Sequence, residues 1–511
     1  MLAVALILVV LVAVYLYGTR TFRYWEKRGI KYETPKPFFG NFSPVFFRSK
    51  SMTQIAAKLY WKYPNERVVG SFRLTHPELL IRDPELVKQI LVTDFVFFNI
   101  RGLNTHKTAI EPLSKNLFFI DGDIWKLLRQ RMTPAFTSGK LRAMFPLIVE
   151  RAERLQNNAI NVPPTGGVLD AREIMARYTT DFIGAVGFGI DSNSLVEEDS
   201  AFRKLGAEIF KFSVNQLLRQ LLKEVFPETF KHLKIMAKVE DDVFALVRNI
   251  LQKRNNKPSG RNDFIDLLLE CKEKGNMVGD SVELTKPDGT PEQVSIALTE
   301  ALMVAQVFVF FAAGFETSAS STSYTLHELA YNPKEQVKVQ QEIDRVLAKH
   351  NNKLSYDAVN EMTYLQCAFN EGIRMMPSLG YLQRKCARRY TFKDLDLTID
   401  EGVTIKIPLQ AMHKDPAYFD DPDSFRPERF QTDFINPMTK HVFLPFGDGP
   451  RACIGERLGK MQSLAGLAAV LSRYSIEPAP ESLRHPKIDP TSNVVQSVIG
   501  GIPLLFRPRI S

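Results

Sequence analysis

The sequence predicts a mainly α-helical protein, with one large domain and small peripheral β-sheets behind a short apolar leader. Helical periodicity covers most of Asp123 to Lys253, and a stretch without proline runs from Ile296 to Tyr331. Strand-like alternation is confined to short pieces. The length of 511 residues would allow about three domains. No repeat, low-complexity tract or Ser/Gly-rich linker divides the chain, so one large domain fits better.

Composition narrows the class of protein. Apolar residues make up 45% of the chain, enough for a large core, and the net charge of +9 is modest. A basic surface of this kind suits an acidic partner or an anionic membrane. No module of basic and aromatic residues typical of nucleic-acid binding is present, so we expect no nucleic-acid partner. The irregular cysteine spacing lacks a zinc pattern and indicates a reduced, cytosol-facing protein, with thiols at Cys271, Cys367, Cys386 and Cys453.

The leader is predicted to be an uncleaved membrane anchor. Leu2 to Tyr17 contains no charge and no proline, and basic residues gather after it, beginning with Arg20 and Arg23. Positive charge belongs on the cytoplasmic side, so the rest of the chain should face the cytosol. A cleaved signal peptide would carry its basic residues before the apolar run. We therefore expect an anchor at 1–19, a basic and proline-containing hinge at 20–37 and a catalytic domain at 38–511.

The first part of the body is expected to alternate between small elements. Val68 to Arg82 should form a small sheet broken at His76-Pro77, and Pro84 to Val92 a short helix. Phe97 to Ile120 lacks a clean period and should be irregular. Gly184 to Gly189 is not a GxGxxG pattern and follows a helix, so we interpret it as a helix end rather than a nucleotide site.

The second part has one dominant feature, the helix expected from Ile296 to Tyr331, which Asn332-Pro333 should end. A loop is expected before it, from Gly275 to Pro291. Strand-like pieces follow at Arg389 to Ile407 and Val494 to Phe506.

The middle of the long helix carries a polar group in an apolar setting. Val304 to Phe315 is apolar on nearly all sides, which indicates burial, and Glu316-Thr317-Ser318 follows directly. An acid beside two hydroxyls costs several kcal/mol there if unpaired, so a functional role is expected. The structural alternative for Thr317 is a hydrogen bond to the carbonyl one turn earlier.

The run from Phe446 to Gly455 contains one cysteine in a glycine-rich loop before a helix. The amides and positive dipole end of a helix N-terminus favour the thiolate of Cys453 over the thiol. A lone thiolate with amide donors around it suits a single iron bond. The structural alternative is a buried, inert cysteine.

This run matches Phe-x-x-Gly-x-Arg-x-Cys-x-Gly, and the chain resembles the cytochrome P450 monooxygenases, in particular their microsomal, insect detoxification-type members. The resemblance implies the cytochrome P450 fold and haem b with Cys453 as the axial iron ligand. It implies that Arg451 pairs with a haem propionate and that Phe446 packs beside the thiolate. Gly449 and Gly455 would let the backbone pass close to the porphyrin.

Four further motifs occur in the order the family has them, so the resemblance spans about residues 35 to 508. In the family's oxygen-activation motif, Thr317 would hold the proton-donating network at the dioxygen site and Glu316 would relay protons from solvent. Glu371-x-x-Arg374, together with Arg429, implies a buried charged triad.

Two motifs would bind the haem propionates. Trp125-x-x-x-Arg129 matches the family's propionate-binding pair, and Arg384 matches another arginine that reaches a propionate. The alternatives are a core aromatic for Trp125 and a solvated charge for Arg384.

Together these features imply a monooxygenase that inserts one atom of O2 into a lipophilic substrate, a xenobiotic or an endogenous lipid or hormone. Electrons would come from NADPH through NADPH-cytochrome P450 reductase, with cytochrome b5 as a further candidate partner. The chain would sit in the endoplasmic reticulum membrane. Two alternatives remain, a haem-thiolate isomerase or dehydratase that does not use O2, and a non-catalytic haem-binding membrane protein.

Three surfaces are also expected, the first from the resemblance and the other two from the distribution of apolar and basic residues. A substrate pocket would be lined by parts of 98–119, 202–236, 308–317, 378–382 and 495–499. Residues 208–239 would form a membrane-dipping rim or, equally well, a solvated helix pair. A basic dock for the reductase would comprise Lys126, Arg131, Lys140, Arg142, Lys440, Arg457 and Lys460.

Overall fold

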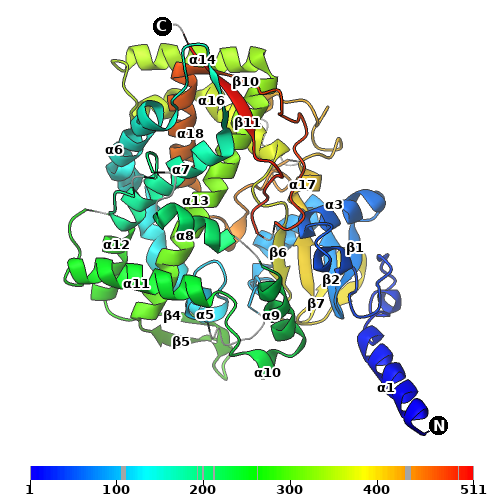
Figure 1. Cartoon of the computed structure of the whole chain (residues 1–511). Coiled ribbons are helices and arrows are strands. Elements are labelled where there is room, and N and C mark those ends of the chain that lie inside the picture. Colours follow the sequence, from blue (N-terminus) through cyan, green and yellow to red (C-terminus); the bar gives the residue numbers. More distant parts are fainter. Residues whose placement is uncertain are drawn as a thin grey trace.

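The computed structural model describes residues 2–104, 111–192, 194–197, 201–210, 213–261, 263–431, 439–492 and 494–509. In this part of the chain a large body of helices lies beside a smaller region built on a β-sheet (Figure 1). The predicted fold class, mainly helical with small sheets, is confirmed. The N-terminal helix α1, Leu2–Thr19, projects from the sheet side, away from the helical body.

The segment after α1 is held against the sheet. Trp25 is fully buried, and its indole N–H donates to the carbonyl of Ser71 over 3.0 Å. A side chain at Gly70 would collide with that indole, because a Cβ there would lie 2.5 Å from it. The segment expected to be a hinge is therefore attached to the sheet through Trp25.

The main sheet has four strands in the order β1-β2-β9-β6. β1 (Val68–Arg73) and β2 (His76–Ile81) are antiparallel, as predicted, and turn at Leu74, before the expected break. β9 (Thr404–Ile407) pairs parallel with β2, and β6 (Leu382–Lys385) antiparallel with β9. The sheet thus pairs residues 68–81 with residues 382–407, which lie far apart in the sequence.

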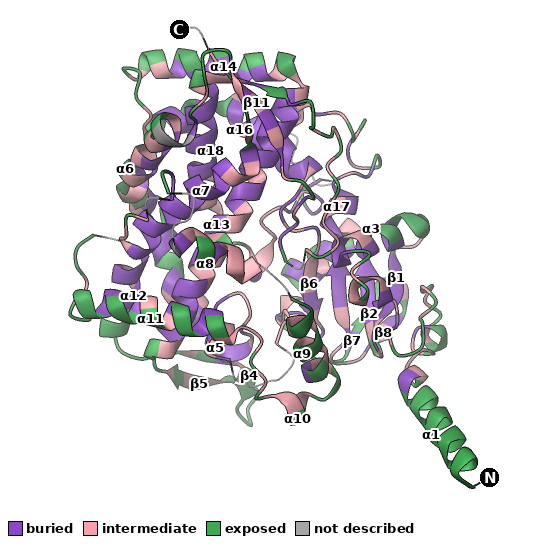
Figure 2. Cartoon of the chain, viewed as in Figure 1, coloured by how far each residue is buried: buried purple, intermediate pink, exposed green. Residues whose placement is uncertain are grey.

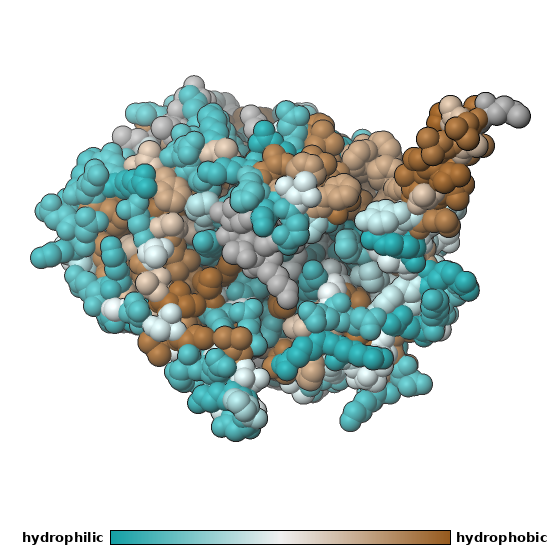
Figure 3. Space-filling view, turned by 90° about the horizontal axis from the view of Figure 1, so that it is seen from below, coloured by the Kyte–Doolittle hydropathy of each residue, from teal (hydrophilic) through white to brown (hydrophobic). Residues whose placement is uncertain are grey.

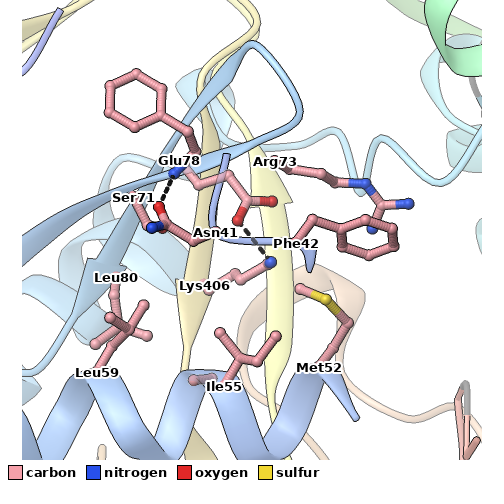
Figure 4. A pocket seen from close by; sticks show the side chains of 12 residues that line it. Asn41, Phe42, Met52, Ile55, Leu59, Ser71, Arg73, Glu78, Leu80 and Lys406 are labelled. Carbon is pink, nitrogen blue, oxygen red and sulfur yellow. Dashed lines mark hydrogen bonds and ion pairs between the residues drawn. The ribbon is translucent and has the colours of Figure 1, made fainter. Parts of the chain in front are cut away.

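Helix α3, Met52–Lys62, covers this sheet and encloses a small pocket with it (Figure 4). Inside, Lys406 Nζ and Glu78 Oε2 form a buried ion pair at 2.7 Å. The cavity measures about 10 Å³, room for a water molecule at most. It lies apart from the predicted site residues and is not a substrate pocket.

The centre of the helical body is α13, Glu300–Tyr331, buried along most of its length (Figure 2). The α-helices that pack most extensively against it are α7 (Ala171–Ile183), α16 (Thr363–Met375) and α18 (Glu456–Arg473). α13 begins four residues later than Ile296, because Ile296 belongs to a strand and Thr299 caps the helix by accepting from the amide of Leu302. The expected end at Tyr331 is confirmed.

The remaining elements surround this centre. The other helices are α2 (Ser43–Phe46), α4 (Pro84–Lys88), α5 (Gly122–Met132), α6 (Ser138–Arg154), α8 (Ala201–Phe210), α9 (Val214–Val225), α10 (Pro227–Phe230), α11 (Ala237–Lys253), α12 (Phe264–Glu273), α14 (Pro333–Lys349), α15 (Tyr356–Glu361) and α17 (Leu409–Met412). The other strands are β3 (Gly167–Asp170), β4 (Met277–Thr285), β5 (Pro291–Ile296), β7 (Tyr390–Phe392), β8 (Leu397–Ile399), β10 (Tyr474–Pro478) and β11 (Pro503–Pro508).

The prediction of a loop over Gly275 to Pro291 is wrong. β4 and β5 form an antiparallel hairpin that packs on α5. Asp123 of α5 accepts hydrogen bonds from Ser281 Oγ and from the amide of Val282, at 2.7 and 2.6 Å. These tertiary bonds stabilise a hairpin whose own sequence is too polar and exposed to show clear alternation.

Two other expectations are met in part. Gly184 to Phe188 continues α7 as a short π-helical turn, and Gly189 ends the helix in the left-handed conformation. The glycine-rich run is therefore a helix end. Of the strand expected over Val494 to Phe506, only the C-terminal part forms β11, which pairs with β10 and β3.

Candidate active site

The loop before α18 is shaped by its glycines and by one backbone bond. The amide of Cys453 donates to the carbonyl of Phe446 over 2.8 Å, closing the loop on itself. Gly449 has φ +69°, and a Cβ there would lie 1.9 Å from the carbonyl oxygen of Leu91. Gly449 is therefore required by a close approach to a neighbouring chain segment, whereas a Cβ at Gly455 would meet nothing within 4 Å.

The exposure of Cys453 and the pKa of its thiol together indicate that its sulfur lines a hollow within the protein. The residue is exposed, yet burial is the largest cause that raises the pKa of its thiol, partly offset by the Gly455 amide. Both hold if the side chain lines an interior space. Ala313, in the middle of the buried helix α13, is exposed as well. Exposed positions on α13 and on the cysteine loop are what a flat cofactor between them would require.

Four arginines gather on one side of the cysteine loop. Arg451 is fully buried and stacks on Trp125, with 4.1 Å from its guanidinium carbon to the ring centre. Arg129, one turn further along α5, donates to the carbonyl of Ala452 over 2.7 Å. Arg101 donates to the carbonyl of Arg451 over 2.9 Å, and Arg384 comes from β6.

The positive charge of these four arginines is not balanced by carboxylates of the described residues. Among the described residues, Asp121 is the one carboxylate paired with them, at 2.6 Å from Arg451. Burial lowers the pKa of Arg101 to about 10, and burial together with Arg101 and Arg129 lowers that of Arg451 to about 9. Burial, then Arg101 and Arg451, lowers the pKa of Arg384 well below its usual value. A guanidinium whose pKa falls is one whose charge its surroundings do not balance.

The site therefore fits a dianionic group. Arg384 is 2% exposed and its Nε has no partner among the described residues. Such an orphaned, buried donor costs about 1–3 kcal/mol unless an acceptor fills the place. Two carboxylates, as haem carries, would satisfy this donor and balance the surplus of positive charge.

Across the hollow, Thr317 and Glu316 sit in the middle of α13. The Thr317 hydroxyl donates to the carbonyl of Ala313 over 2.6 Å, which is the structural alternative considered for this residue. Because its proton is used in this bond, the hydroxyl presents oxygen lone pairs to any donor in the hollow. Glu316 forms an ion pair with Arg172 of α7, whose other terminal nitrogen donates to Ser320 over 2.9 Å.

The expected charged triad of Glu371, Arg374 and Arg429 is present. Glu371 and Arg374 have no exposed surface, and two bonds of 2.7 and 2.9 Å join them. Arg429 reaches the same carboxylate at 3.2 Å. The Arg374 guanidinium also donates to the carbonyls of His413 and Pro422, which locks α16 to the segment that leads into the cysteine loop.

Sequence reasoning missed three residues of this site. Arg101 and Asp121 bracket the irregular stretch before α5, where no periodicity indicates burial. Arg172 stands in an ordinary amphipathic helix, α7. Only an excess of buried arginines over acidic residues could have pointed to Arg101, and which residues are buried is known only once the fold is known.

Comparisons with known proteins agree with this geometry. The sequence model of the cytochrome P450 family matches residues 30–500. The chain is 36% identical to cytochrome P450 6B2 of Helicoverpa armigera over 99% of its own length and 98% of that protein. It is 36% identical to cytochrome P450 6a2 of Drosophila melanogaster over 96% of both chains. It is 35% identical to cytochrome P450 6B1 of Papilio polyxenes over 95% of both. The chain with this hollow, its cysteine and its surplus of arginines belongs to the cytochrome P450 family and is a haem-dependent monooxygenase.

Proposed function

We propose that the chain oxidises lipophilic compounds with one atom of O2, using electrons that a membrane-bound reductase takes from NADPH. Cys453 would bind the haem iron through its sulfur, and Trp125, Arg129, Arg384 and Arg451 would hold the haem propionates. When bound, haem supplies the activation of dioxygen, which an electron-rich thiolate ligand favours. Everything else in the reaction is positioning and proton handling by the residues of this chain.

The observation that carries this proposal is the imbalance of charge beside Cys453. Within the described part of the chain, four arginines share one protein carboxylate, and one buried guanidinium nitrogen lacks an acceptor. A dianionic cofactor with its metal near the sulfur accounts for both features. An inert structural cysteine would account for neither.

Thr317 and Glu316 are proposed to handle protons. The Thr317 oxygen can hold a proton donor, such as water, over the exposed face of Ala313. Glu316 lies on the side of α13 that faces α7, where Arg172 keeps it close. Proton delivery from Glu316 therefore requires its carboxylate to leave Arg172, or to act through Ser320, which shares the same guanidinium.

The substrate is proposed to be lipophilic because the described segments expected at the pocket are rich in aromatic side chains, which pack together in the buried core. Phe311 of α13 stacks edge-on with Phe202 of α8 at 4.9 Å between ring centres, and Phe315 lies near Phe210. Apolar pockets with few polar groups bind ligands of this kind. Toxin, hormone and fatty acid all remain possible substrates.

The reductase is proposed to dock near α5 and α18, on a smaller basic surface than expected. The β4–β5 hairpin takes up two of the seven residues: Lys126 donates to the carbonyl of Asp280, and Arg131 to that of Asn276. Arg142 pairs with Asp357 and Lys460 with Glu456, although both cations remain partly exposed. Weaker electron transfer at high salt would support the dock.

Membrane attachment is proposed through α1 and a second contact on α9. Figure 3 shows α1 as an apolar rod projecting from a largely hydrophilic surface. α1 is long and apolar enough to cross a membrane. On α9, Val214, Leu218 and Leu222 are exposed. We propose that both dip into the endoplasmic reticulum membrane from the cytosolic side.

The decisive experiment is the spectrum of the reduced, carbon-monoxide-bound protein. The unmodified chain should show the Soret band characteristic of a thiolate ligand, and Cys453→Ala should lose it. A normal band in Cys453→Ala would overturn the proposal. Turnover that needs neither NADPH nor O2 would favour the isomerase or dehydratase, and reduction without turnover of any lipophilic probe would favour the non-catalytic alternative.

A further inference from the structure

Side chains from three separate elements donate hydrogen bonds to the backbone of α13 at one place. Thr179 Oγ1 of α7 lies 3.0 Å from the carbonyl oxygen of Phe315 and 3.2 Å from that of Ala176 in its own helix, and it donates to the nearer one, Phe315. Gln462 Nε2 of α18 donates to the carbonyl of Gly314 over 3.2 Å. Ser378 Oγ, after α16, donates to the carbonyl of Thr317 over 3.0 Å.

A regular helix does not need such donors, because each carbonyl accepts from the amide four residues further on. Other hydroxyls on α13 bond back to their own helix: Ser320, Ser321, Thr322, Ser323 and Thr325 each donate to the carbonyl one turn earlier. The bonds from Thr179, Gln462 and Ser378 instead cross between elements, and they meet within the Gly314–Thr317 segment.

The donors are themselves buried, which makes their bonds informative. Thr179 has no exposed surface and Gln462 is 1% exposed. The Oε1 atom of Gln462 has no partner among the described residues. A leucine at this position would fill similar space without an orphaned oxygen, so the amide is best explained by its bond to Gly314.

α7 also presses directly on this point. A Cβ at Gly314 would lie 2.4 Å from Ile183 Cδ1, so α7 occupies the space that a side chain at Gly314 would need. α18, which follows the cysteine loop, packs beside α7 and brings Gln462 to the same residue. The backbone at Gly314 is thus held between the helix that follows Cys453 and the helix that carries Arg172.

We propose that Thr179 and Gln462 are positioning residues, which hold the α13 backbone at Gly314 and Phe315 and thereby fix where the Thr317 hydroxyl points. The inference rests on the proposed role of Thr317. Thr317 bonds to the carbonyl of Ala313, directly before the two clamped carbonyls. A shift of this short segment therefore moves both the hydroxyl and the exposed face of Ala313.

The test compares Thr179→Val with Thr180→Val in the full-length, haem-loaded protein. Both threonines have no exposed surface, but Thr180 donates to the carbonyl of Ala176 within α7, so its loss leaves α13 untouched. Amide hydrogen exchange in peptides covering residues 308–322 should become about fivefold faster in Thr179→Val, as the loss of one hydrogen bond predicts, and stay near the unmodified rate in Thr180→Val.

Turnover gives the second readout. In Thr179→Val, product formed per NADPH should fall about two- to fivefold and hydrogen peroxide should rise, at unchanged haem content. Thr179→Ser restores the hydroxyl and should restore both values. Gln462→Leu should resemble Thr179→Val.

Equal exchange rates in Thr179→Val and Thr180→Val would overturn the positioning role. So would faster exchange in Thr179→Val with unchanged product per NADPH. The failure of the proposed function looks different, because the unmodified chain would then lack the thiolate band or NADPH-dependent turnover, whereas the exchange comparison does not depend on turnover.

Discussion

At the scale of single residues, the site is defined by charge. Arg101 contributes two bonds, to the carbonyls of Phe118 and Arg451, and its guanidinium stacks on Phe118 at 4.4 Å. Its backbone amide donates to Asp121, the carboxylate that Arg451 also uses. Arg101 therefore orders the other members of the cluster as well as adding positive charge.

We predict that Arg101→Met weakens haem retention. Methionine keeps most of the side-chain volume but removes a cation and two donors, so haem should dissociate about tenfold faster, as the loss of a charge-assisted bond implies. Transfer of haem to an acceptor such as apomyoglobin measures this rate. Arg67→Met, which removes an exposed pair with Asp83 on the sheet, is the control and should leave the rate unchanged.

Thr317→Ala is predicted to divert electrons to hydrogen peroxide while haem content stays normal. The oxygen that can hold a proton donor is lost, whereas the backbone bonds around it remain. Peroxide and product are counted per NADPH consumed. Thr317→Ser keeps the oxygen and should remain close to the unmodified protein; coupling unchanged in Thr317→Ala would contradict the assigned role.

Much of this site is readable from short patterns, since Cys453, Arg451, Trp125 and Thr317 each stand in a recognisable spacing. What spacing cannot give is the partner of each group. For Glu316 the sequence predicts a functional acid in an apolar helix but names no partner, and the structure pairs it with Arg172, which is far away in the sequence. Long-range pairs of this kind depend on how helices cross, which no local pattern encodes.

At the scale of elements, α13 shows where local sequence suffices to predict structure, and the β4–β5 hairpin shows where it does not. The apolar run of α13 and its Asn-Pro stop predict the helix and its end. The prediction fails for the hairpin because one face of the hairpin is covered only by α5, through Asp123 and Ser281. Its secondary structure follows from tertiary contacts, so its own alternation is weak.

The triad of Glu371, Arg374 and Arg429 holds its elements together. We predict that Glu371→Gln destabilises the fold by about 3–5 kcal/mol, because Arg374 is left as an uncompensated buried charge. Urea unfolding of the purified protein, followed together with haem content, measures this loss. The matched control is Asp420→Asn, an exposed partner of Arg429 and Arg426, expected to cost at most about 1 kcal/mol. Similar stability in the two variants would contradict a structural role for the buried pair.

At the scale of the whole molecule, buried neutral histidines set the acid limit of stability. Burial and the charge of Arg374 lower the pKa of His413 to about 3, and its Nε2 accepts from the amide of Leu444 over 3.3 Å. Burial likewise lowers the pKa of His327 to about 4. Below the unfolded value of about 6.5, the unfolded chain binds protons that the folded chain does not, so stability falls as the pH drops.

We predict that the free energy of unfolding decreases between about pH 6.5 and pH 4, by up to about 1.4 kcal/mol per pH unit for each of these histidines. His413→Gln should make this dependence shallower by about one proton. Urea unfolding at several pH values gives the slope. His232→Gln, at an exposed position, serves as the control, and an identical slope in His413→Gln would contradict the assignment.

The surplus of arginines beside Cys453 has a consequence for the life of the chain in the cell. A newly made polypeptide that folds around this cluster without haem would bury several unbalanced cations together. The haem-free form should therefore remain incompletely folded and be easily degraded. Abundance would then follow iron and porphyrin supply: starving cells of the precursor should clear the polypeptide even while its messenger is still being translated.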